Sequence, residues 1–295
     1  MDRLKSLANV MQSQATARER ERKGTDALHS PLSIQVYNAD AASFHGNAVL
    51  VCGETDAVLL GIGLSRADAL RITAMVLDSK KVLKTIYVGW PDPDCHVGLD
   101  VIKQHFPHAV ALATAPTLQK IETTLIKNRQ LFDRSAAAQA RHVAGLPTLL
   151  QGDRLVLERE VLEVRGIDDS QQHRSYVWIP GIKTLVAGLN VYGAVHLWTA
   201  CTSDDQARAD WRRTLDDMLA LQPERVIPGC SLPDSAQDVS QIRWTRDYLD
   251  RLEAELAMAP GSNSLIRAME RAYPEAGLPV ALHIGARVGM GEMKW

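Results

Sequence analysis

Apolar and polar positions along the first part of the chain predict strands, followed by strands and helices in alternation. Three short apolar or alternating runs, at 34–37, 48–52 and 57–60, are typical of consecutive strands joined by turns. A helix is predicted from Ser65, because Ser65 and Asp68 form the pattern of a helix N-cap with an acidic third position. The β-branched and aromatic run at 85–88 then predicts a buried strand.

The rest of the chain repeats this order of elements. The predicted helices are 99–106, 117–132, 207–221 and 236–258, with a final pair after 260, and the predicted strands are 109–114, 154–157, 162–164, 176–179, 184–187 and 225–228. Two halves of this kind predict an α/β fold of the four-layer αββα sandwich type. A doubly wound dinucleotide-binding sheet fits less well, because Gly61-Ile62-Gly63 stops after two of the three glycines that its first turn needs.

The composition and net charge of the chain exclude some classes of binding partner. The chain has 295 residues, 46% of them hydrophobic, and we predict a single domain over 30–295 after a polar arm at 1–29. A formal net charge of -2 provides no basic surface for nucleic acid or for an anionic membrane. No apolar run approaches the roughly 20 residues of a membrane span, and the N-terminus lacks the apolar core of a secretory signal. We therefore expect a cytoplasmic protein; apolar stripes on the last helices leave a homo-oligomer open.

One loop and four cysteines are candidates for chemistry. The segment 89–96 follows the buried strand 85–88 and contains two prolines, which predicts a rigid loop where α/β proteins often place a site. The cysteines are Cys52, Cys95, Cys201 and Cys230. Their wide spacing in a large chain favours free or metal-bound thiols over a disulfide framework. Any one of them also suits a small buried core position, which is where we expect Cys52.

Several spaced motifs from about residue 34 to the C-terminus resemble the metallo-β-lactamase superfamily. The run Trp90-Pro91-Asp92-Pro93-Asp94-Cys95 stands where that family has His-x-His-x-Asp-His, or His-x-Asp-x-Asp-His in a bacterial subgroup. His173 looks like the third ligand histidine of the family, and Val226-Ile227-Pro228-Gly229-Cys230 resembles its Val-Ile-Pro-Gly-His, with cysteine in the ligand position.

Two further segments carry the resemblance. Gly188 resembles the glycine before the family's bridging aspartate, but Leu189 stands in the aspartate position. The run His196-Leu197-Trp198-Thr199-Ala200-Cys201 resembles the same bacterial subgroup with Cys201 in place of an aspartate, as does the ending at 291–295. The resemblance thus implies the αββα fold together with an altered set of metal ligands.

The implied site is a metal site that contains cysteine. A two-zinc hydrolase needs three histidines on one metal and an Asp/His set on the other, around a bridging hydroxide. Thiolate and imidazole ligands suit Zn²⁺ first, with Fe or Cu(I) as alternatives. The candidate ligands are Asp92, Asp94, Cys95, His173, Cys201 and Cys230.

The resemblance also implies roles around this metal. Asp94 is the candidate general base, and Trp90, His96 and His196 are expected to line the substrate pocket of a hydrolase acting on a small ester, lactone or lactam. Two alternatives remain open. One is a non-catalytic binding protein without metal, whose pocket Trp90 fills. The other is a thiol-based enzyme that uses Cys95 and Cys230 as a nucleophile or a redox pair.

Overall fold

The computed structural model describes residues 32–89, 95–132, 146–167 and 174–295, with the side chains of 95–97 and 124–132 left out. The N-terminal arm therefore lies outside the described residues, as do Trp90, Asp92, Asp94 and His173. In the described parts of the chain, no helix combines the length and apolar character that crossing a bilayer requires.

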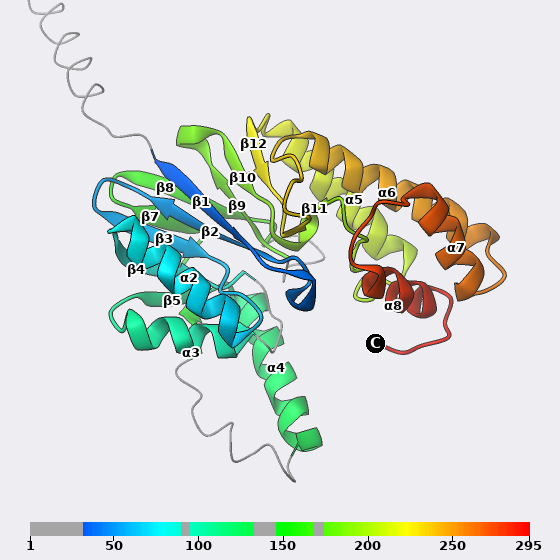
Figure 1. Cartoon of the computed structure of the whole chain (residues 1–295), viewed down its shortest axis with the longest axis horizontal. Coiled ribbons are helices and arrows are strands. Elements are labelled where there is room, and N and C mark those ends of the chain that lie inside the picture. The colour runs from blue at the N-terminus through cyan, green and yellow to red at the C-terminus, as the bar shows by residue number, and fades with distance from the viewer. Residues whose placement is uncertain (1–31, 90–94, 133–145, 168–173) are drawn as a thin grey trace, which may run out of the picture.

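The first sheet has six strands that follow chain order (Figure 1). They are β1 (Ser33–Asn38), β2 (Asn47–Cys52), β3 (Asp56–Leu60), β4 (Val82–Tyr87), β5 (Val110–Ala113) and β6 (Thr148–Leu149). The first three strands run antiparallel, and β3 to β6 run parallel. Parallel neighbours need crossover connections. These are α2 (Arg66–Ser79), α3 (Cys95–His105) and α4 (Ala115–Phe132).

The second sheet has five strands in the order β12, β10, β9, β8, β7. Their bounds are β7 (Arg154–Leu157), β8 (Glu160–Arg165), β9 (Tyr176–Ile179), β10 (Thr184–Val186) and β12 (Arg225–Ile227). Two short parallel strands, β11 (Tyr192–Gly193) and β13 (Cys230–Ser231), form a separate pair. The helices of this half are α5 (Asp205–Ala220), α6 (Ser240–Met258), α7 (Ser262–Ala272) and α8 (Pro279–Gly289).

Three apolar clusters separate four layers, as the alternation of side chains along a strand requires. On β2, Leu50 faces the cluster beneath α2 and α3, whereas its neighbour Val51 faces the cluster between the two sheets. On the second sheet, Leu185 faces a third cluster shared with Trp211 of α5 and Leu249 of α6. The order is therefore helices, sheet, sheet, helices, which confirms the predicted αββα sandwich.

Two predicted helix starts are wrong. Helix α3 begins at Cys95 and not at 99, so Cys95 and His96 lie in its first turn instead of an extended loop. Helix α6 begins at Ser240 and not at 236. The segment before α6 is held along β12 instead, because the carbonyl oxygen of Gln237 accepts the amide of Val226 at 3.1 Å. Helix α6 is therefore shorter than the hydrophobic periodicity predicted, because a tertiary hydrogen bond holds the residues before it in an extended segment.

Candidate functional site

Strand ends from both sheets meet at one edge of the sandwich, which we call the loop edge and define as residues 87–89, 174–175, 188–190 and 228–230. A hydrogen bond of 2.6 Å joins the phenol of Tyr87, at the end of β4, to the hydroxyl of Ser175, just before β9. Both residues are buried. Burial raises the pKa of Tyr87, so its hydroxyl stays protonated and either oxygen can be the donor.

The backbone of the loop edge is packed too closely for side chains at two glycines. A Cβ on Gly229 would lie 2.2 Å from the carbonyl oxygen of Gly188, which itself has φ +53°. The side chain of Asn190 donates to the carbonyl of Arg174 at 2.7 Å, and the indole N–H of Trp211 donates to the carbonyl of Asn190 at 2.8 Å. These bonds hold the segments at 174 and 188–190 in place.

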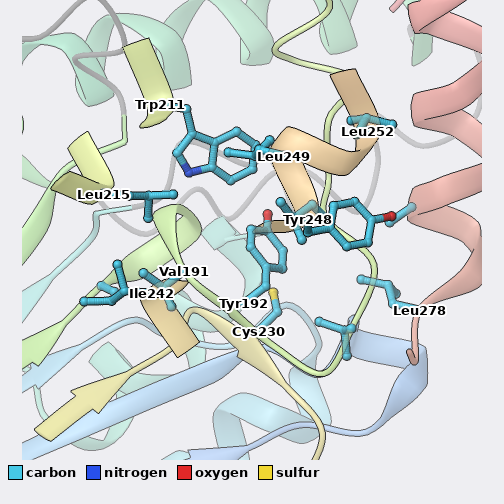
Figure 2. Close-up of a cluster of buried hydrophobic side chains, with 14 of the residues drawn as sticks. Val191, Tyr192, Trp211, Leu215, Cys230, Ile242, Tyr248, Leu249, Leu252 and Leu278 are labelled. Carbon is cyan, nitrogen blue, oxygen red and sulfur yellow. The ribbon is translucent and has the colours of Figure 1, made fainter. Parts of the chain in front are cut away.

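Cys230, which the resemblance puts in the last ligand position, lies in the apolar cluster between the second sheet and helices α5 and α6. Its side chain is 2% exposed and lies beside Tyr192 (Figure 2). Burial raises the pKa of the Cys230 thiol to about 12. A metal binds the thiolate and not the thiol, so this environment opposes the form that a ligand needs. Leu189, in the bridging aspartate position, packs against the same cluster and offers no donor atom.

Arg174 places a guanidinium group inside the loop edge. Its side chain is only 4% exposed, and its Cζ lies 4.2 Å from the centre of the Trp211 ring. Nη2 donates to the carbonyl of Trp198 at 3.3 Å, and Nη1 has no hydrogen-bond partner among the described residues. Burial is the main cause that lowers the pKa of Arg174. A guanidinium nevertheless keeps its proton in proteins.

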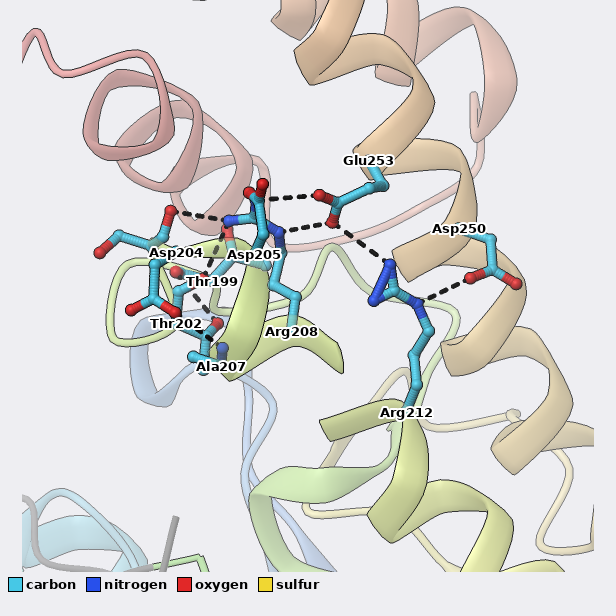
Figure 3. A network of polar contacts seen from close by, with 10 residues as sticks. Thr199, Thr202, Asp204, Asp205, Ala207, Arg208, Arg212, Asp250 and Glu253 are labelled. Atoms are coloured by element: carbon cyan, nitrogen blue, oxygen red, sulfur yellow. Dashed lines mark hydrogen bonds and ion pairs between the residues drawn. The ribbon is translucent and has the colours of Figure 1, made fainter. Parts of the chain in front are cut away.

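Cys201 is exposed, on a turn whose other residues are buried and in which the amide of Thr202 donates to the carbonyl of Thr199 at 2.9 Å. Arg208 holds the chain after it: Nη1 donates to the carbonyls of Thr202 and Ser203, and Nε donates to Glu253 at 2.7 Å (Figure 3). Cys52, Cys201 and Cys230 are all free thiols. Cys201 is thus the exposed thiol of the three, on a turn that the Arg208–Glu253 pair fixes.

His196 is a buried residue that contacts helix α6. Its Nδ1 lies 2.8 Å from the hydroxyl of Tyr248 on α6, and its amide donates to the carbonyl of Gly277. Burial lowers the pKa of His196 to about 4. The neutral imidazole ring therefore links α6 to the segment that follows β11. Its expected contact with substrate stays a prediction, as does that of His96, whose side chain is not described.

The described residues do not fit a two-metal centre. They contain no group of three His, Cys, Asp or Glu side chains that could hold a metal ion. Of the positions that the resemblance assigns to ligands, 189 has no donor and 230 has a buried thiol, while the cation of Arg174 lies directly after His173. A guanidinium at this edge opposes a divalent cation electrostatically. The ligand assignments at Asp92, Asp94, Cys95 and His173 stay predictions, since those side chains are not described.

The sequence patterns did not single out Arg174, Trp211, Tyr87 or Ser175. One signal was present: Arg174 is a charged residue two positions before a strand, β9, in which all four residues are buried. A charge in such a position must have a partner or be exposed. The partner ring comes from α5, however, and no local pattern announces a contact across 37 positions, from Arg174 to Trp211.

The architecture around this edge is that of the metallo-β-lactamase fold. A DIM-1 metallo-β-lactamase exposed to ceftazidime superimposes with a TM-score of 0.54 and 16% identity, over 76% of this chain and 94% of that one. For TMB-1 the values are 0.52 and 14%, over 75% and 93%. A metallo-β-lactamase from Pontibacter korlensis gives 0.50 and 15%, over 75% and 95%. No protein-family model and no curated protein sequence matches the chain.

Proposed function

We propose that this protein is a metallo-β-lactamase-fold protein that binds a small molecule at the loop edge without the two-metal hydrolytic centre. The observation that carries the proposal is the position of Cys230. The side chain at the expected last ligand position lies in an apolar cluster, 2% exposed, with its thiol protonated. A ligand there would have to lose a proton and leave the cluster, and both steps cost free energy.

Two further features support a binding role. Leu189 cannot bridge two metal ions, because its side chain has no donor atom. Arg174 already supplies a positive charge at the loop edge, held against Trp211. The proposed binding site at the loop edge thus contains a fixed positive charge, the guanidinium group of Arg174.

Metal analysis of the full chain tests the proposal. Protein purified without added metal, and then dialysed with one equivalent of Zn²⁺, is analysed for Zn, Fe and Cu by mass spectrometry. We expect less than about a tenth of an equivalent to remain, since the described ligand positions offer a buried thiol at 230 and an apolar side chain at 189. We also expect the melting temperature to stay the same in chelator, because metal that does not bind the folded state does not stabilise it.

The opposite result would support the cysteine-containing metal site instead. In that result the wild-type protein retains about one equivalent of a transition metal. The substitutions Cys95→Ser and His173→Ala abolish this metal content, whereas Cys52→Ser does not change it. Cys52 is the matched control, because it is a buried cysteine on β2, at the far end from the loop edge. Retained metal with turnover of a lactone or thioester would restore the hydrolase interpretation.

A further inference from the structure

Arg174 and Arg208 are equally buried but differ in their partners. Each side chain is about 4% exposed. Arg208 pairs with Glu253 at 2.7 Å and Asp205 at 2.5 Å, and donates to two carbonyls as well. Arg174 has no ion pair with a described carboxylate, and its Nη1 has no described hydrogen-bond partner. One buried guanidinium is neutralised inside the described structure, and the other is not.

An unpaired buried charge is costly, because desolvation removes its water without supplying a counter-charge. The ring of Trp211 and the carbonyl of Trp198 offset part of this cost through a cation–π contact and one hydrogen bond. Neither of them carries a negative charge. The planar N–H fork of a guanidinium matches the oxygens of a carboxylate or a phosphate.

We propose that Arg174 is the binding residue for an oxyanion group, carboxylate or phosphate, of the small molecule that occupies the loop edge. The inference rests on the proposed function and names the chemistry of its ligand. Nη1, which has no partner in the described part of the chain, donates to the oxyanion, and Trp211 holds the guanidinium plane in position.

Stability measurements on two arginine variants test whether a carboxylate of the chain neutralises Arg174. In a zwitterionic buffer without oxyanions, Arg174→Met keeps an unbranched side chain against Trp211 and removes a charge that no described carboxylate neutralises, so its melting temperature equals or exceeds that of the wild type. Arg208→Met leaves Glu253 without its main partner, so its melting temperature falls by several degrees. If Arg174→Met falls as far as Arg208→Met, a carboxylate of the chain itself neutralises Arg174, and the inference is overturned.

Binding measurements test the oxyanion directly. Inorganic phosphate and acetate are titrated into the full chain by calorimetry and by thermal shift, with sodium chloride at equal ionic strength as the control. We expect saturable binding of one of the two, which distinguishes a phosphate from a carboxylate ligand. In Arg174→Met the affinity falls by about tenfold or more, and in Arg174→Lys it falls less, because lysine keeps the charge without the fork.

Two outcomes contradict the inference. One is that neither anion exceeds the chloride control. The other is that phosphate stabilises the wild type and Arg174→Met equally, as a salt excluded from every protein surface does. Metal content is measured on the same samples. Metal-free protein that binds no oxyanion overturns the present inference alone, whereas about one equivalent of metal overturns the proposed function.

Discussion

The phenol of Tyr87 and the hydroxyl of Ser175 form a hydrogen bond of 2.6 Å that joins the two sheets at the loop edge. Tyr87 ends a strand of the first sheet, and Ser175 precedes β9 of the second. Both side chains are buried, so each depends on the other for its hydrogen bond. The pair fixes the spacing of the layers where the candidate site lies.

Removing one partner of this pair therefore destabilises the protein. We expect Tyr87→Phe to lower the free energy of unfolding by about 1–2 kcal/mol, because the Ser175 hydroxyl stays buried without its partner. Urea denaturation measures the change. Adding Ser175→Ala to Tyr87→Phe lowers stability by less than the sum of the single effects, since the two residues share one interaction. Additive effects in this cycle would show that the bond contributes no coupling.

Asp68 is a second buried junction, between β1, the turn after it, and α2. Its carboxylate accepts the hydroxyls of Tyr37 at 2.6 Å, Ser43 at 2.5 Å and Ser65 at 2.6 Å. Burial by itself would raise the pKa of Asp68, but the hydrogen bonds from these three hydroxyls outweigh it, and the pKa is lowered. The carboxylate therefore contributes stability above its unfolded-state pKa of about 4, and that contribution is lost as the pH falls through the folded-state pKa.

We expect Asp68→Asn to lower the free energy of unfolding by about 2 kcal/mol at pH 7, because three hydroxyls lose a charged acceptor. The difference from the wild type shrinks as the pH falls below about 4, because the unfolded wild-type chain takes up a proton there and the folded carboxylate follows only at its lowered pKa. Chemical denaturation at several pH values measures both effects. Asp40→Asn is the control, because Asp40 is exposed and its side chain accepts from the amide of Ala42. A gap that does not depend on pH would contradict the assigned role.

The three described thiols differ in their reactivity. Burial raises the pKa of Cys52, and it raises that of Cys230 from 9.0 to about 12, which reduces the Cys230 thiolate about 1,000-fold. In a Cys95→Ser background, we expect a disulfide reagent to modify one thiol quickly, Cys201, and the other two only on unfolding. Mass spectrometry after limited labelling identifies the site. Rapid labelling of Cys230 would show that its thiol reaches the solvent, which would weaken the proposed function.

His196 makes stability depend on pH in a separate window. Its pKa is lowered from 6.5 to about 4 by burial, so the unfolded chain takes up a proton at a pH at which the folded ring stays neutral. Stability from the neutral ring is present above pH 6.5 and is lost as the pH falls from 6.5 towards 4. After allowance for solvent screening, we expect a loss of about 1 kcal/mol, or roughly 2–4 °C in melting temperature.

The matched variants separate this titration from the hydrogen bond. His196→Gln has a flatter stability profile between pH 6.5 and pH 4, because no titrating ring is left. Tyr248→Phe removes the hydroxyl 2.8 Å from Nδ1 but keeps the ring, so its profile stays steep. Equal slopes in His196→Gln and in the wild type would assign the pH dependence to another group.

Local patterns in the sequence predicted most of the elements, because the signals that start and stop them are local. The capping box of Ser65 and Asp68 is present as predicted, and the first residue of the helix follows Ser65. The apolar run at 48–52 likewise predicted a strand, and both faces of β2 are buried. Helix α3 shows the limit: it begins at Cys95, although no residue pattern before 99 indicated a helix.

Local patterns in the sequence predicted the order of the longer strands and helices and hence the αββα class, since period and capping act within a few residues; the two-residue strands β6, β11 and β13 were missed. They did not determine the direction in which Cys230 points or which ring covers Arg174. A short strand such as β13 places successive side chains on opposite sides, so a shift of one position exchanges a site residue for a core residue. Only the packing of α5 and α6 on the second sheet decided that Cys230 belongs to the core and that Arg174 stacks on Trp211.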